Sequence, residues 1–93
     1  MVKKITEDDL MWVTDLAVRR LALLLVAQLQ DENAKSATAS SDLRLLKLHT
    51  PREGSLLLAR IRGVVVKTLP AIRIHSVTGS RKSDQYVITI TLV

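Results

Sequence analysis

Residues 50–93 read TPREGSLLLARIRGVVVKTLPAIRIHSVTGSRKSDQYVITITLV and contain the clearest secondary-structure signals of the chain. Thr50, Pro51 and Glu53 form a capping box with proline at the first helical position, so a helix is predicted to begin at Pro51. Apolar residues then recur at helical spacing as far as Pro70. Because proline cannot continue a helix, we expect the helix to end there.

Residues 56–69 also allow a second interpretation. Ala59–Arg62 alternates and Val64–Val66 is β-branched, so the segment could form two strands around Gly63. The strong cap at its beginning favours the helix over the strands.

The last part of the chain is predicted to be an antiparallel hairpin with one buried face. Ala71–Val77 and Tyr86–Val93 both alternate between the two faces of a strand. The connection at residues 78–85 is long, polar and basic, and Gly79 can supply a positive φ. We therefore expect residues 78–85 to project as a hairpin arm.

The first part of the chain predicts one long helix over residues 7–31. Thr6 is a typical N-cap, and the carboxylates that follow it suit the positive end of a helix dipole. Trp12, Ala22 and Val26 interrupt the polar stripe of this helix. They are therefore candidate interface residues that another subunit covers, and the alternative is a core that one chain wraps tightly.

Two further segments complete the expected order of elements. Residues 34–42 are small and polar and predict a mobile loop, whereas Leu43–His49 favours a strand. Val2–Ile5 could add a short first strand. We expect a single α+β domain over residues 1–93, with two helices packed on a small mixed sheet, in the order (β)-α-β-α-β-β with a C-terminal antiparallel hairpin.

The charges are divided unequally along the chain. Residues 1–42 contain five Lys and Arg against seven Asp and Glu, whereas residues 43–93 contain nine against two. The positive charge of residues 43–93 is typical of a surface that binds a polyanion, that binds an acidic protein partner, or that keeps an apolar protein in solution.

Catalytic and metal sites are not predicted. His49 and His75 lack a motif around them, the chain has no cysteine, and the three glycines are too dispersed to hold a phosphate. We expect no enzyme activity and no cofactor. The longest apolar run, Leu21–Ala27, is too short to span a bilayer, so we expect no membrane contact and a cytoplasmic location, or a virion.

The basic half indicates binding to DNA or RNA. The expected phosphate contacts lie on the second helix, the sheet and the arm, and they are Arg60, Lys67, Arg73, Arg81 and Lys82. Single-strand platforms stack bases on aromatic rings, and Tyr86 is the only aromatic residue of this half. A duplex held by its backbone, without strong sequence specificity, is therefore the expected ligand.

The order of elements and the basic hairpin resemble the Alba family of chromatin and RNA-binding proteins and, more loosely, the C-terminal domain of bacterial translation initiation factor three. The likeness covers Leu43–Leu92. It implies a dimer that places the hairpin arm, here Thr78–Asp84, in the minor groove. The chain differs at Thr6–Asp9, where the family has a basic turn that contains glycine.

Residues 55–93 are also similar to small baseplate or sheath-initiator proteins of contractile phage tails. Those proteins combine a helix, a proline and a terminal hairpin whose strands join the sheet of a neighbour, as Tyr86–Val93 could. This resemblance implies the alternative function, a structural subunit of a larger assembly such as a phage tail or virion. The subunit would dock by its apolar first helix and its last strand, and in either case the protein is expected to form an oligomer.

Overall fold

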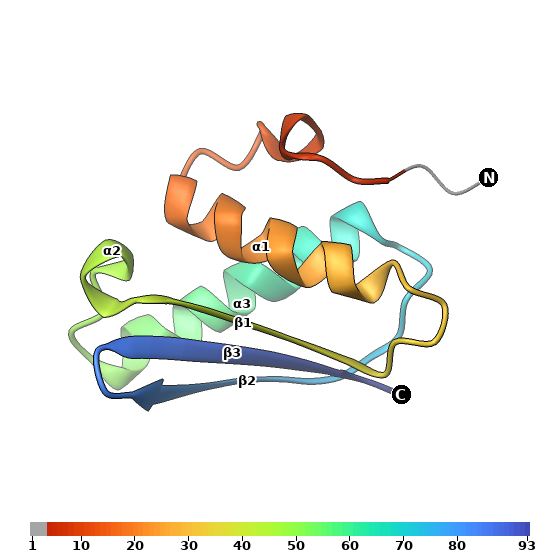
Figure 1. The fold of residues 1–93 in the computed structure, drawn as a ribbon. Coiled ribbons are helices and arrows are strands. Elements are labelled where there is room, and N and C mark those ends of the chain that lie inside the picture. Colours follow the sequence, from red (N-terminus) through yellow and green to blue (C-terminus); the bar gives the residue numbers. More distant parts are fainter. Residues whose placement is uncertain (1–3) are drawn as a thin grey trace.

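The computed structural model describes residues 4–93 (Figure 1). Its elements are the 3-10 helix η1 (Glu7–Leu10), α1 (Leu16–Leu29), β1 (Ser36–Asp42), α2 (Leu43–Leu46), α3 (Pro51–Thr68), β2 (Ile74–Lys82) and β3 (Gln85–Leu92). The expected α+β class and the order α-β-α-β-β are confirmed. Of the possible first strand, residues 2 and 3 lie outside the described residues, and Lys4 and Ile5 form no strand.

The three strands form one sheet in the order β1-β3-β2, with β3 in the centre. Both pairings are antiparallel, so the expectation of a mixed sheet is wrong. The physical reason is the connectivity: α3 returns the chain to the far side of β3, and the two-residue turn after β2 reverses it again.

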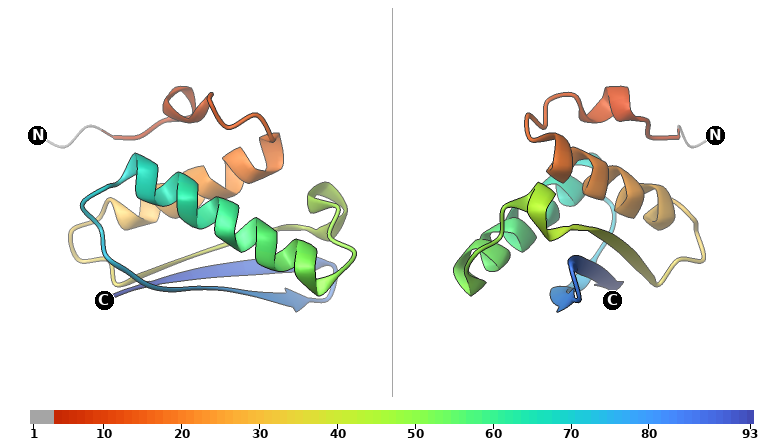
Figure 2. Two further views of the ribbon diagram at one scale, coloured as in Figure 1. Left: turned by 180° about the vertical axis from the view of Figure 1, so that it is seen from behind. Right: turned by 60° about the vertical axis from the view of Figure 1, so that its left-hand side comes forward.

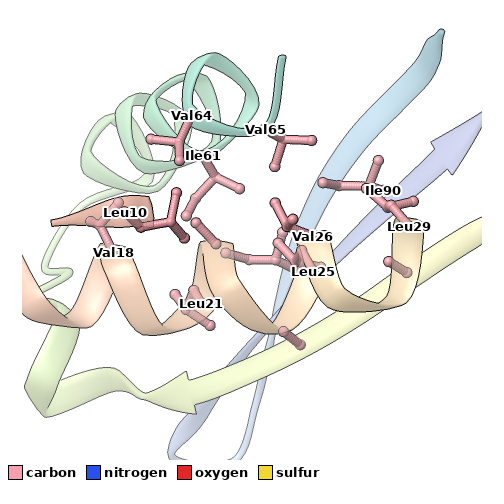
Figure 3. Packing of buried hydrophobic residues seen from close by; sticks show 14 of the residues in the cluster. Leu10, Val18, Leu21, Leu25, Val26, Leu29, Ile61, Val64, Val65 and Ile90 are labelled. Carbon is pink, nitrogen blue, oxygen red and sulfur yellow. The ribbon is translucent and has the colours of Figure 1, made fainter. Parts of the chain in front are cut away.

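Helices α1 and α3 lie on the same face of the sheet, as the two views of Figure 2 show. Figure 3 shows the apolar side chains of these helices directed toward one another above the sheet. The fully buried large residues are Leu10, Val18, Leu21, Leu25, Val26, Ile61, Val65, Ile88 and Ile90. Within residues 4–93 no helix combines the length and the apolar character needed to cross a membrane.

Helix α3 forms as its sequence predicts. The backbone N–H of Glu53 donates to Thr50 Oγ1 at 3.2 Å, and Thr50 Oγ1 donates to the Glu53 carboxylate at 3.2 Å. The helix runs through Gly63 to Thr68, directly before Leu69 and Pro70. The alternative with two strands around Gly63 is therefore wrong.

The single helix expected at residues 7–31 is wrong, because η1 ends at Leu10, residues 11–12 form a turn, and α1 begins only at Leu16. Asp15 acts as a second N-cap, and its Oδ1 accepts from the N–H of Ala17 at 2.9 Å and of Val18 at 3.3 Å. The Arg19 guanidinium donates to the Val13 carbonyl at 2.8 Å and so holds this link against α1. A capping aspartate inside an apolar pattern was the missed signal.

The loop expected at residues 34–42 and the strand expected at Leu43–His49 are both wrong. Residues 36–42 form β1, with Ala37 and Ala39 buried under α1. Only small side chains fit there, and this makes the strand look like a linker in the sequence. Asp42 then caps α2 by accepting from the N–H of Arg44 at 2.8 Å, and Lys47 ends it with a φ of 54°.

The hairpin is tighter than expected. The strands continue through residues 78–82 and resume at Gln85, so Ser83 and Asp84 alone form the turn and no separate arm projects. Ser83, with a φ of 57°, takes the left-handed conformation that was expected of Gly79. Gly79 instead makes room for Tyr86, because a Cβ at this position would lie 2.6 Å from the Tyr86 Cζ atom.

The outer edge of β1 is covered by a side chain from α1. Gln28 Nε2 donates to the Thr38 carbonyl at 2.8 Å, and Gln28 Oε1 accepts from the Thr38 N–H at 3.1 Å. The amide thereby forms the two hydrogen bonds that a neighbouring strand would form. This contact also fixes the distance between α1 and β1.

Candidate nucleic-acid interface

The five predicted phosphate contacts are all exposed, but they do not form one cluster. Arg60 and Lys67 lie two turns apart on α3, whereas Arg73 precedes β2 and Arg81 and Lys82 end it. Because a strand rises about 3.3 Å per residue, Arg73 and Arg81 are separated by about 25 Å.

Arg81 and Lys82 belong to a group of cations at one end of the molecule. Figure 1 shows α2, the beginning of α3 and the turn between β2 and β3 together at this end. The N–H of Leu43 donates to the Asp84 carbonyl at 2.9 Å and links α2 to the turn. We call this group the basic end, and its members are Arg44, Lys47, Arg52, Arg81 and Lys82.

Most cations of the basic end form no ion pair. Arg44 is the exception, because its guanidinium lies 3.2 Å from the Asp42 carboxylate. The side-chain hydrogen bond from Arg44 is the main cause that lowers the pKa of Asp42. Within residues 4–93, no ion pair involves Lys47, Arg52, Arg81 or Lys82.

A half-open pocket of about 400 Å³ lies at the basic end, between the loop before α3 and strand β2. Arg81 and His49 contribute polar groups to its lining, and Leu48 and Leu58 contribute apolar ones. The other histidine, His75, is exposed on β2. In the described part of the chain, no three His, Asp or Glu side chains converge in a way that could hold a metal ion.

Arg60 and Lys67 lie in a different place, beside Trp12. The Lys67 ammonium is 4.5 Å from the centroid of the indole ring, and the Arg60 guanidinium is 3.9 Å from the Asp15 carboxylate. A groove of about 300 Å³, which we call the Trp12 groove, is lined by Trp12, Arg60, Gly63 and Lys67. Sequence reasoning missed it, because Trp12 belongs to the acidic half of the chain and no local pattern relates it to α3.

Of the three predicted interface residues, one is exposed and two are buried. Trp12 is 47% exposed, but Ala22 and Val26 are 0% exposed. Both lie on the face of α1 that packs against the rest of the chain, so the interface prediction is wrong for them. Ala22 and Val26 interrupt the polar stripe of α1 because α3 and the sheet pack against this helix.

The last strand also differs from the docking element that the phage resemblance implies. Strand β3 pairs with β1 on one side and β2 on the other, so Tyr86–Val93 has no free edge for a neighbour. Exposed apolar side chains remain elsewhere: Leu16, Leu24 and Leu45 border a groove between α1 and α2.

No protein-family model, curated protein or solved structure matches this chain. The function is therefore inferred from the geometry of the molecule itself.

Proposed function

We propose that the protein is not an enzyme and that it binds duplex DNA or RNA through phosphate contacts from the basic end. The observation that carries the proposal is the location of four exposed cations, Lys47, Arg52, Arg81 and Lys82, on three separate segments that come together at one end of the molecule (Figure 1). Cations that gather only in the folded chain are typical of a polyanion site. Because nucleic acid occurs in the cytoplasm and in virions, we also propose that the protein is located in the cytoplasm or in a virion.

The chemistry of the basic end favours contact with the backbone over base recognition. Tyr86, the aromatic residue there, packs against Gly54 and Gly79 and is only partly exposed. Phosphate contacts from Lys and Arg carry no sequence information. Binding is therefore expected to tolerate any sequence.

A titration at two or more salt concentrations tests this function. We expect log K for a generic duplex to fall with log salt with a slope of about −3 to −4, because about four cations each release close to one counterion. The measurement is fluorescence anisotropy of a labelled duplex. Absence of binding at low salt, or an affinity that does not change with salt, would contradict the proposal.

Assembly through α1 is a second candidate function, and the exposed leucines favour it. Leu16, Leu24 and Leu45 are 47%, 52% and 64% exposed and border one groove, and exposed apolar side chains that lie together can mark a protein–protein contact. We expect light scattering to detect a dimer that Leu24→Arg converts to a monomer. A wild-type monomer at high concentration would remove this candidate.

A further inference from the structure

Trp12 is the single tryptophan of the chain, and its ring has a fixed position. The indole Nε1 donates to the Asp9 carbonyl at 3.0 Å. Leu10 and Val13, on either side, are buried in the core, so the link cannot leave α3 without exposing them. An exposed and preoriented indole suits a flat ligand, because little freedom is lost on binding.

Gly63 lies in the middle of α3 and lines the same groove as Trp12, and the packing of the chain does not require a glycine there. A Cβ at Gly63 would have no other atom within 4 Å. Glycine inside a helix lowers stability relative to alanine. Since Gly63 lines the Trp12 groove between Arg60 and Lys67, its missing side chain gives a ligand access to the helix surface.

The two cations of the groove are held by contacts that a ligand can replace. The side chains of Arg60 and Asp15 are 57% and 44% exposed, and ion pairs this exposed contribute little to stability. Lys67 makes an exposed cation–π contact with Trp12. Stacking of a base on an aromatic ring is the stronger of these two contacts.

We propose that the Trp12 groove binds an unpaired nucleotide, with its base stacked on Trp12 and its phosphate held by Arg60 and Lys67. The base displaces the Lys67 ammonium, whose flexible side chain then reaches the phosphate. An acidic peptide would neutralise the cations but would leave the indole without a flat partner. This inference rests on the proposed function and adds a second contact to it.

The single tryptophan provides a direct measurement. We expect a short single-stranded oligothymidylate to quench the intrinsic fluorescence, and a blunt duplex of the same length to quench it much less. Polyglutamate is the control for charge alone. Quenching by polyglutamate but not by the oligonucleotide would overturn the inference and assign the groove to an acidic peptide.

Three variants, at two positions, separate nucleotide binding in the groove from the stability of the fold. Trp12→Leu is expected to weaken single-strand binding about tenfold, the loss of one stacked base, and Trp12→Tyr, which retains an aromatic ring, to weaken it much less. Gly63→Ala is expected to raise the melting temperature and yet weaken single-strand binding, because its methyl group enters the groove. Both effects are measured by anisotropy and thermal melts, with duplex binding unchanged.

The outcomes of these experiments distinguish the nucleotide site in the Trp12 groove from the proposed duplex binding by the basic end. Binding of either nucleic acid with unchanged tryptophan fluorescence would contradict the nucleotide site in the Trp12 groove but not duplex binding by the basic end. The same holds if Trp12→Leu and Gly63→Ala bind the single strand as tightly as the wild type. Failure to bind any nucleic acid at low salt would overturn both proposals.

Discussion

Replacement of both Arg81 and Lys82 by glutamate is expected to lower the affinity for a generic duplex about a hundredfold at low salt. Each change removes an attraction of about 1 kcal/mol at contact distance in water and adds a repulsion of similar size, which salt partly screens. The slope of log K against log salt should become less steep by about two, one for each lost phosphate contact. Anisotropy titrations of the variant at several salt concentrations measure both quantities.

A matched control is the double variant Arg20→Glu and Lys35→Glu. Both residues are exposed, lie on α1 and before β1, and carry the same charges as Arg81 and Lys82. Since the net charge changes equally, this control isolates position from the general field of the protein. An equal loss of affinity in both variants would show that the field, and not the basic end, attracts the nucleic acid.

Ile88→Ala is expected to destabilise the fold by about 2–5 kcal/mol, the usual cost of removing a large aliphatic side chain from a core. Ile88 is 0% exposed in the central strand, and its cross-strand neighbours are Ala39 and Gly79. These two neighbours are too small to fill the cavity. Because small domains have about 5–15 kcal/mol of total stability, urea denaturation should show a clear decrease in the midpoint with an unchanged m-value.

The adjacent residue serves as the control for this substitution. Thr89 points to the opposite face of the sheet, which no helix covers (Figure 2), and its Oγ1 lies 3.5 Å from Thr38 Oγ1. Thr89→Ala should therefore cost less than about 1 kcal/mol. Comparable losses at both positions would contradict the division of β3 into a buried and an open face.

Local signals explain which elements the sequence predicts correctly. The Thr50 capping box and Pro70 bound α3 within a few residues, and alternation in the last strand defines β3. Strand β1 was missed, because its small residues are required by the packing of α1, a contact distant in sequence. The break before α1 was missed because Asp15 fits both an exposed helical position and an N-cap.

The candidate sites also combine features that the local sequence predicts with features that depend on contacts distant in sequence. The exposure of Arg60, Lys67, Arg73, Arg81 and Lys82 could be predicted, since charged residues rarely lie in a core without a partner. The basic end could not be predicted, because α2 and the hairpin turn meet only in three dimensions. Tyr86 is the only aromatic residue of the basic half of the sequence, but the fold places Trp12, from the other half, beside Lys67.

The Gln28 amide makes the two margins of the sheet unequal. It occupies the backbone groups of Thr38 on β1, whereas on the outer side of β2, in the described part of the chain, Val77 and Gly79 have no comparable cover. Protein sheets that are exposed at both margins can recruit chain after chain into fibrils. Here the Gln28 amide occupies the middle of the β1 edge, so β2 is the edge at which a strand of another molecule can pair without first displacing this side chain, and pairing through two β2 strands joins two molecules.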